Sequence, residues 1–333
     1  MTPVTSAAGA MLAQAANPPA VISPPITLHQ LLTGFQTDPL SLLATAVSFV
    51  VLCGYLGFRR RLQSRGRSWS DWRTASFAVG IVTIFVATGS GLASYDDSNF
   101  VLHVVQHLLL MNVAPILLAL GAPVTLLLQS SERRATTRVL KVLHSRPVEA
   151  LTHPVLVAVL AYVTMLVYFL TPIYTFAAAH PLVHDYVHLH FLLSGCLYWW
   201  PVVGLDPTRW RMSYPVRLGY LATGVPINAM IGIALTLNHA SIDPRIHTLA
   251  DTHAGGGVFW GISELILLAG IAVMYVQWSR WDDREAARAD RRLDRELARS
   301  SGRGLAGGVI MDPTTGLWHY PADAPRPSRA PPP

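Results

Sequence analysis

Charged side chains are scarce in this 333-residue chain: 13% of the residues are Asp, Glu, Lys or Arg, whereas 51% are hydrophobic. A soluble globular chain carries about 25% charged residues, so lipid is the expected solvent for most of the surface. The formal net charge of +6 does not indicate nucleic-acid binding, because nearly all basic residues lie outside the apolar runs, either between them or after the last one, as expected of residues that determine membrane topology.

Cysteine occurs only at Cys53 and Cys196, which argues against a disulfide framework or a thiolate cluster. The single lysine, Lys141, lies in a basic segment, so a retinal Schiff base is not expected. Neither a P-loop nor a dinucleotide-binding glycine motif is present, which excludes nucleotide-driven transport within this chain. The first 20 residues lack a basic segment and a long apolar core, so we expect no cleaved signal peptide there.

Seven apolar runs are long enough to cross a membrane, for which roughly 20 residues in a helix are needed. These continuous runs lack the alternation of a β-barrel, so they predict an all-α polytopic bundle of about seven transmembrane helices. The third run contains Pro115 and Pro123, which predict a kink or a tilted exit. The seven runs are Pro39–Phe58, Thr74–Ala93, Phe100–Leu128, Pro154–Ile173, Tyr186–Val203, Pro215–Leu237 and Gly257–Trp278.

The basic residues predict the orientation of the bundle. All of the 25 Lys and Arg residues except Arg245 fall in or beside the segments that follow runs one, three, five and seven. Because positive residues are retained on the cytoplasmic side, we expect the N-terminus outside and the C-terminus in the cytoplasm.

Four regions follow from this pattern. We expect residues 1–38 to form an external tail, in which Ile26–Phe35 lies on the membrane surface as a short amphipathic helix. We expect residues 39–279 to form the transmembrane domain and residues 280–303 to form a charged cytoplasmic helix. The Gly- and Pro-rich residues 304–333 are expected to be disordered.

The histidines show the opposite distribution from the basic residues. All of the 13 histidines except His144, His153 and His319 fall on the external side or in the outer half of a run. His103, His107 and Met111 follow one another at intervals of four residues, which places them on one helix face. A second such series is His180, His184 and His188 at the entry to the fifth run. Imidazoles within a membrane are costly unless they have partners, so this distribution indicates a site.

The segment that leads into the seventh run contributes further polar residues. Glu264 lies about 12 Å deep at 1.5 Å per residue, where an ionisable group is a functional candidate. The predicted metal ligands are His103, His107, Met111, His184, His188, His239, Asp251, His253 and Glu264.

Imidazole and thioether ligands favour copper, especially Cu(I), over magnesium or calcium, whereas histidine with carboxylate would also suit zinc. We hypothesise a metal site, or a path of several weak sites, that opens to the external face. Neutral imidazole is the ligand, so binding should weaken as the pH falls through about 6. No enzymatic activity and no catalytic residue are predicted.

Two stretches resemble a known family. The segment HVVQHLLLMNVAPILLALGAPVTLLL, from His103 to Leu128, resembles the signature of the caa3-type cytochrome c oxidase assembly factor family (CtaG-like). The segment DTHAGGGVFWGISE, from Asp251 to Glu264, is similar to the stretch that leads into the family's last helix. The resemblance covers about residues 30–280 and excludes the basic C-terminal extension.

The resemblance implies a multi-pass protein of a bacterial plasma membrane that helps to deliver copper to the CuB centre of the oxidase's catalytic subunit. It implies roles for His103, His107 and Asp251. The implied partners are that subunit, an external copper donor protein and membrane lipid, with no nucleic acid. Two alternatives remain open from the residues alone: a zinc-dependent membrane hydrolase with Glu264 or Asp251 as base, and a haem protein ligated by His107 and His188.

Overall fold

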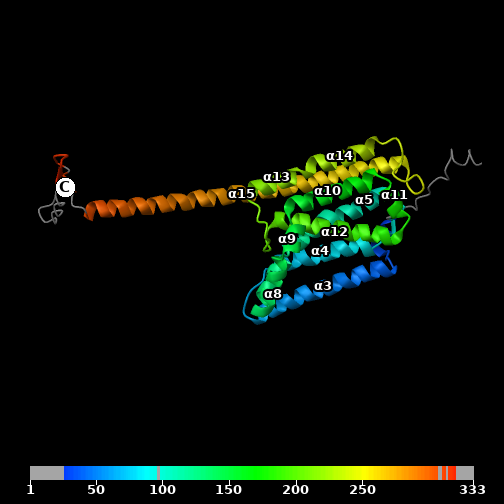
Figure 1. Cartoon of the computed structure of the whole chain (residues 1–333), viewed down its shortest axis with the longest axis horizontal. Helices are drawn as coiled ribbons and strands as arrows, with labels where there is room; N and C mark the ends of the chain where they lie inside the picture. The colour runs from blue at the N-terminus through cyan, green and yellow to red at the C-terminus, as the bar shows by residue number, and fades with distance from the viewer. Residues whose placement is uncertain (1–25, 96–97, 307–309, 313, 320–333) are drawn as a thin grey trace, which may run out of the picture. The chain divides into compact units, whose positions relative to one another are not determined.

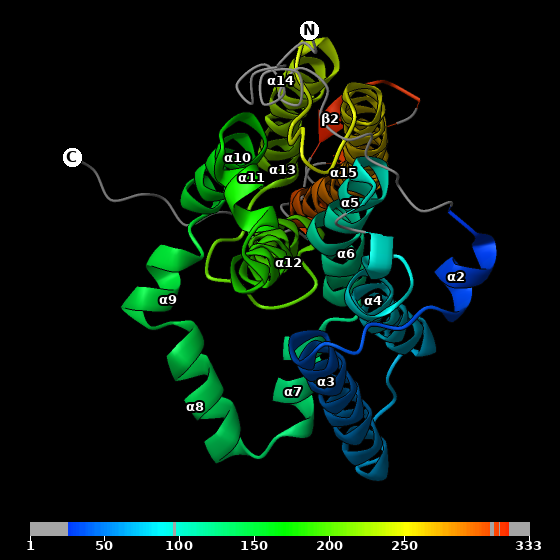
Figure 2. The same ribbon diagram turned by 90° about the vertical axis from the view of Figure 1, so that its right-hand side faces the viewer.

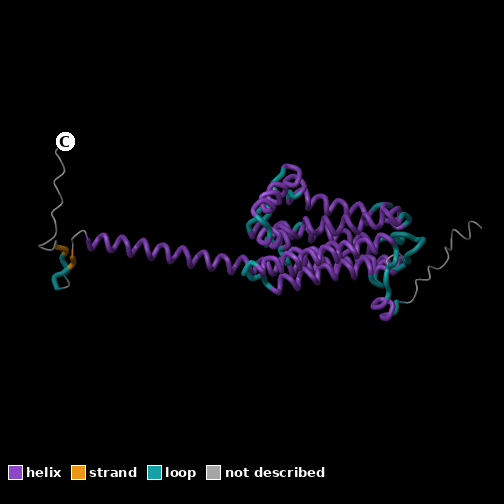
Figure 3. The backbone as a smooth tube through the Cα atoms, turned by 90° about the horizontal axis from the view of Figure 1, so that it is seen from below, coloured by secondary structure: helices purple, strands orange, loops and turns teal. Residues whose placement is uncertain are grey.

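The structure is a computed structural model that describes residues 26–95, 98–306, 310–312 and 314–319. Within these residues the chain is almost entirely helical, as the purple tube of Figure 3 shows. The chain divides into two units, Met1–Ala272 and Val273–Pro333, and the division falls inside the last helix. The all-α polytopic membrane bundle expected from the apolar runs is confirmed.

The first unit contains most of the helices. In chain order the elements are α2 (Leu28–Thr33), α3 (Pro39–Ser64), α4 (Asp71–Gly89), η1 (Ala93–Tyr95), α5 (Phe100–Leu108), η2 (Leu109–Val113), α6 (Ala114–Leu120), α7 (Pro123–Ser130), α8 (Arg133–Leu143), α9 (Arg146–Leu151), α10 (Pro154–Leu170), α11 (Ile173–Ala178), α12 (Pro181–Val203), α13 (Tyr214–Ala222), α14 (Gly224–Leu237) and α15 (Leu249–Ala306).

The third apolar run, predicted as one helix with a kink, is interrupted twice. A π-helical turn, η2, follows α5 directly, and α6 begins after it with Pro115 in its first turn. Ala122 then adopts the left-handed conformation with φ of 46°, and Pro123 starts α7. Because proline lacks an N–H group and fits the first turn of a helix, both prolines mark helix starts.

The helices pack around two apolar clusters. One joins α3, α4, α6 and α7 through buried residues such as Phe77 and Leu126. The other joins α5, α10, α11, α12, α14 and α15 through residues such as Phe100, Phe169 and Phe259. In the end-on view of Figure 2, α12 lies between α10 on one side and α6 on the other, and it packs against both.

Large apolar side chains also face outward from the bundle. Val50 is 68% exposed and Leu265 is 68% exposed. A water-soluble protein rarely exposes such continuous apolar surface, so these faces are suited to lipid contact.

Among the residues that the structure describes, five segments are long and apolar enough to span a membrane: Pro39–Ser64, Asp71–Gly89, Phe100–Ser130, Tyr214–Leu237 and Leu249–Ala298. The two remaining predicted spans correspond to α10, which is apolar but has only 17 residues, and to α12, whose histidines and Asp185 lower its hydropathy. Seven crossings and the outside position of the N-terminus therefore remain predictions.

The two ends of the bundle differ in composition. The basic segments that contain α8 and α9 lie at one end, and the starts of α5 and α12 lie at the other (Figure 1). Helix α8 was not foreseen: its basic residues Arg134, Arg138 and Lys141 share one face, and none of its residues is buried.

Some predicted boundaries shift. Helix α12 begins at Pro181 and not at Tyr186, and α15 begins at Leu249 and not at Gly257. Asp251 and His253 therefore lie on the last helix, whereas they were expected in the preceding loop. Helix α2 falls within the stretch predicted to be a surface helix.

The second unit begins within α15, which extends through the charged segment 280–303 to Ala306. A short antiparallel pairing of β1 (Ile310–Met311) with β2 (Trp318–His319) follows (Figure 3). Residues 1–25, 307–309, 313 and 320–333 lie outside the described residues, so most of the predicted tails remain predictions.

Candidate metal centre

Helix α5 carries the first two candidate ligands, and its start is held in two ways. The side chain of Asn99 accepts a hydrogen bond from the Leu102 backbone N–H at 3.0 Å, as an N-cap does. The carboxylate of Asp251 accepts a second bond from the Phe100 backbone N–H at 2.7 Å. The last helix therefore fixes the beginning of the helix that carries His103 and His107.

His103 and His107 occupy one face of α5, as the four-residue spacing predicts. Their ring centroids lie 4.2 Å apart, and only 2% and 3% of the two residues are exposed. This face points into the bundle, so the imidazoles do not contact lipid.

Helix α12 brings two more histidines to this face. The His184 ring stacks on that of His103 at 5.4 Å, and the His188 ring meets that of His107 at 5.0 Å. The two α12 rings are 4.4 Å apart. We call His103, His107, His184 and His188 the histidine cluster.

Three members of the histidine cluster are close enough to share one metal ion. One ring nitrogen each from His103, His107 and His184 lies within 4.8 Å of the other two. Zinc, for example, binds imidazole nitrogen at about 2.0–2.1 Å, so small side-chain movements would bring the three nitrogens into one coordination sphere.

His107 shows why such a site is chemically reasonable. Both of its ring nitrogens are buried, and neither has a hydrogen-bond partner among the residues that the structure describes. A buried polar group without a partner is costly and uncommon in native proteins. A metal ion would satisfy one of these nitrogens, so the residues present fit a metal.

Aromatic side chains surround the histidine cluster. The Tyr168 ring stacks on His107 at 5.4 Å, and its hydroxyl lies 3.4 Å from Nε2 of His103. Phe191 packs edge-on against His107 at 5.0 Å, and Tyr174 packs edge-on against His103 at 5.2 Å. This wall restricts the movement of the imidazoles and limits access of water.

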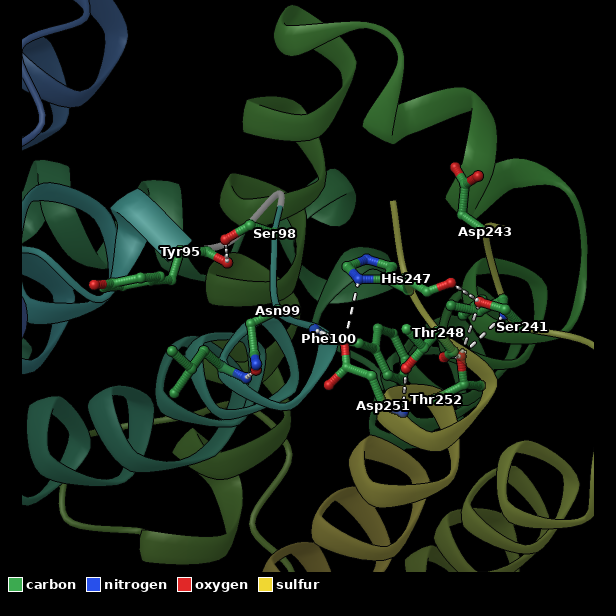
Figure 4. Close-up of polar contacts among 12 residues, drawn as sticks. Tyr95, Ser98, Asn99, Phe100, Ser241, Asp243, His247, Thr248, Asp251 and Thr252 are labelled. Carbon is green, nitrogen blue, oxygen red and sulfur yellow. Dashed lines mark hydrogen bonds and ion pairs between the residues drawn. The ribbon is translucent and has the colours of Figure 1, made fainter. Parts of the chain in front are cut away.

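A polar network lies next to the histidine cluster at the start of α15 (Figure 4). Figure 4 shows His247 beside Asp251. His247 is buried, and its Nε2 lies 2.7 Å from the Tyr174 hydroxyl. Nδ1 of His247 lies 3.3 Å from the Asp251 carboxylate, which also binds the Phe100 N–H. Asp251 therefore acts through neighbours: it positions α5 and His247, and through Tyr174 it supports the wall around His103.

Other predicted ligands lie elsewhere. His239 is exposed, and His253 makes a 2.8 Å contact from Nε2 to the carbonyl of Asn238. Glu264 is partly buried on α15, and its Oε1 has no hydrogen-bond partner among the described residues. The group of three imidazoles contains none of these side chains.

Met111 lies in the π-helical turn and not on a continuous α-helix with His107. A π-turn inserts one extra residue per turn, so the expected series of residues at intervals of four is interrupted after His107. Met111 lines a small cavity together with Asn112, Met165 and Trp199. Trp199 Nε1 donates a hydrogen bond to Asn112 Oδ1 at 3.2 Å in this part of the bundle.

Two glycines allow the helices that carry ligands to approach closely. A Cβ atom at Gly195 of α12 would lie 2.9 Å from Cγ of Pro115 and closer still to the Met111 carbonyl oxygen. A Cβ atom at Gly255 of α15 would lie 2.7 Å from Cε1 of Phe100. Only glycine permits these distances, so the two residues set how close α12 and α15 lie to the segment from α5 to η2.

The geometry gives no support to the two alternative readings. In the haem model a porphyrin would lie between His107 and His188, but these rings are in direct contact. In the hydrolase model a carboxylate would act beside the metal, but the group of three imidazoles includes neither Asp251 nor Glu264.

Sequence reasoning missed Tyr168, Tyr174, His247 and Gly195 as parts of the site. Apolar patterning places the aromatic residues inside a helix bundle without specifying their neighbours. His247 was grouped with the external histidines, and its distance of four residues from Asp251 is the signal that could have paired them.

Comparison with known proteins identifies relatives. The model of the family described as "Cytochrome c oxidase caa3 assembly factor" matches residues 53–281. An uncharacterized protein of Mycobacterium bovis is 31% identical over 291 residues, which covers 82% of this chain and 44% of the relative. An uncharacterized protein of Mycobacterium tuberculosis gives the same values, and one of Mycobacterium leprae is 29% identical over 270 residues, covering 76% and 41%.

The chain thus spans less than half the length of these curated relatives. No solved structure matches it. The family model covers the bundle from α3 into α15 and includes the histidine cluster, which is more than half of the chain. The chain therefore belongs to the cytochrome c oxidase caa3 assembly factor family.

Proposed function

We propose that this protein assists the assembly of a cytochrome c oxidase by binding copper at the histidine cluster and passing it to the CuB centre of the catalytic subunit. The observation that supports this proposal is that ring nitrogens of three imidazoles, from α5 and α12, lie within 4.8 Å of one another. They do so inside a membrane bundle of this family. Copper is the cargo in this proposal, and the site holds it only transiently. The protein would act in the plasma membrane of a bacterium.

The location of the histidine cluster suggests the direction of transfer. The cluster lies toward the end of the bundle opposite the arginine-rich segments, so copper would enter from the external face under the predicted orientation. An external copper donor protein would supply the ion, and the catalytic subunit would receive it within the bilayer. Membrane lipid would surround the exposed apolar faces of α3, α10 and α15.

A deletion strain provides the test. The gene is removed and restored either as wild type or as His107→Ala, and the terminal oxidase is purified from each strain. His190→Ala is the matched control, because His190 lies on α12 but is not one of the three grouped imidazoles.

We expect the deletion and His107→Ala strains to yield an oxidase with normal haem spectra and a reduced copper content, and the control to yield the wild-type enzyme. A fully metallated oxidase from the His107→Ala strain, with equal amounts of the assembly factor in the membrane, would refute copper delivery by this cluster.

A further inference from the structure

The segment that connects α12 to α13 borders a hollow at the arginine-rich end of the bundle. The hollow has a volume of about 300 Å³, enough for a small polar group, and it lies where α12 ends and where α7 and α13 begin. Its polar lining consists of Thr125, Asp206, Thr208, Arg211 and Arg217. None of these residues belongs to the histidine cluster, so the hollow is a separate feature of the fold.

The two arginines of the hollow are not neutralised by acidic side chains. Arg217 donates hydrogen bonds to the backbone carbonyls of Met212 at 3.0 Å and of Val202 at 3.2 Å. Neither Arg217 nor Arg211 forms an ion pair with a carboxylate among the residues that the structure describes. Arg211 is exposed, so positive charge is available to a ligand in the hollow.

Asp206 reduces this charge without cancelling it. Its buried carboxylate accepts hydrogen bonds from the backbone N–H groups of Thr125 at 2.7 Å and of Val124 at 3.2 Å, at the start of α7. Two arginines and one aspartate leave the lining with one net positive charge. This charge matches a phosphodiester, which carries a single negative charge, better than a phosphomonoester, which carries about −1.5 to −2 near neutral pH.

The guanidinium group of Arg217 is held in place before any ligand arrives. Gly204 ends α12 in the left-handed conformation with φ of 63°, and a Cβ atom there would lie only 2.6 Å from Nη2 of Arg217. Glycine therefore lets the guanidinium group pack against the backbone, where the two carbonyls fix it. A fixed planar group of N–H donors is well suited to phosphate oxygens.

Apolar side chains lie directly beside these polar groups. Leu205, which lines the hollow, is 40% exposed, and Val216, the neighbour of Arg217 in sequence, is 55% exposed. A ligand that contacts both kinds of surface must be amphiphilic. Under the predicted orientation the hollow faces the cytoplasmic leaflet, where basic pockets between helices meet anionic lipids.

We propose that this hollow binds the phosphodiester headgroup of an anionic phospholipid, whose acyl chains lie beside Leu205 and Val216. The headgroup would join the end of α12 to the starts of α7 and α13, so the bound lipid should stabilise the bundle. Because the hollow shares no residue with the histidine cluster, this proposal does not depend on copper binding.

The experiment uses the full-length protein in a nonionic detergent after its lipids have been removed. The melting temperature is measured while short-chain phosphatidylglycerol, phosphatidylcholine with the same chains, glycerophosphoglycerol or inorganic phosphate is added. Arg211→Gln is the test variant, because Arg211 is exposed and its loss should leave the fold intact. Arg134→Gln is the matched control, since it removes the same charge from α8 at the same end of the bundle, outside the hollow.

We expect phosphatidylglycerol to raise the melting temperature of the wild type, and phosphatidylcholine and the two water-soluble phosphates to have little effect. Loss of a charged hydrogen-bonding partner typically lowers affinity about tenfold. Arg211→Gln should therefore need about tenfold more phosphatidylglycerol for the same rise, whereas Arg134→Gln should match the wild type.

Four results would each overturn the proposal. Equal stabilisation by phosphatidylcholine would show that the charge of the headgroup is not recognised, and equal stabilisation by glycerophosphoglycerol or inorganic phosphate would identify a site for a soluble phosphate. Equal loss in Arg211→Gln and Arg134→Gln would indicate diffuse attraction to a basic surface. No stabilisation of the folded wild type by phosphatidylglycerol would show that the hollow does not bind this lipid.

Discussion

Gly195→Ala is the most direct test of how the histidine cluster is assembled. Gly195 lies where α12 touches the π-helical turn, and an added Cβ would meet Cγ of Pro115 and the carbonyl carbon of Met111, both at 2.9 Å. Ordinary carbon contacts begin near 3.4 Å, so α12 must move by at least about 0.5 Å against a backbone that cannot rotate away. The same helix carries His184 and His188.

Two consequences are expected. Overpacking in a close contact costs about 1–3 kcal/mol of stability. Displacing ligands that must be held to within about 0.5 Å lowers metal affinity, and we expect a loss of about 10- to 100-fold, the range found when groups that orient metal ligands are altered.

The assay measures the affinity of the variant for Ag(I), a redox-inert substitute for Cu(I), and its thermal unfolding in detergent. Gly57→Ala on α3 is the matched control, because nothing lies within 4 Å of a Cβ at that position. The control should retain wild-type affinity. If Gly195→Ala keeps both the affinity and the melting temperature of the wild type, close contact between α12 and η2 does not position the ligands.

Two further predictions concern the start of α15 and the segment that precedes it. Asp251→Ala removes the acceptor for the Phe100 N–H and the partner of His247, so we expect a loss of about 1–2 kcal/mol in unfolding free energy by thermal denaturation. Asp251→Asn should retain most of this stability, and equal losses in both variants would contradict the role as an acceptor. Burial raises the pKa of Asp243, but hydrogen bonds and charge from Arg245 outweigh it and hold the pKa below the ordinary value of a carboxyl group. A carboxyl group whose pKa is lower in the folded than in the unfolded protein stabilises the fold at pH values above its unfolded pKa, so this contribution is lost as the pH falls below about 4. Arg245→Gln should therefore reduce the loss of stability between pH 6 and 3, measured by unfolding. An unchanged profile would argue against the role of Arg245.

Several features of the bundle could be predicted because they depend on residues near one another in sequence. The four-residue spacing predicted that His103 and His107 share a face, and their rings lie 4.2 Å apart. The series broke down at Met111, which lies in the π-helical turn η2. Helices α12 and α4 pack against this turn, and the residue spacing does not indicate it. Pro115 correctly predicted a disturbance there, but not its kind.

The amphipathic helix α8 was read as a loop. Its basic and apolar residues recur with a strong helical period, which is the signal that could have identified this helix. An 11-residue basic helix is too short and too polar to be found as an apolar run that spans a membrane. Conversely, His239, His253 and Glu264 were grouped with the site because they share its predicted side or depth. Depth along the membrane normal specifies nothing about rotation around a helix axis, and rotation decides which side chains meet.

The sequence by itself determined that this chain is a helical membrane bundle, because the length and composition of an apolar run suffice for a helix in lipid. It also determined the segregation of histidines from arginines and, through its motif, the family. Only the tertiary structure decided that His184 of α12 joins His103 and His107 while Asp251 holds the start of α5. Both arrangements depend on close contacts at Gly195 and Gly255 between segments that are far apart in the chain. Such contacts are determined by tertiary packing and cannot be inferred from a local sequence pattern.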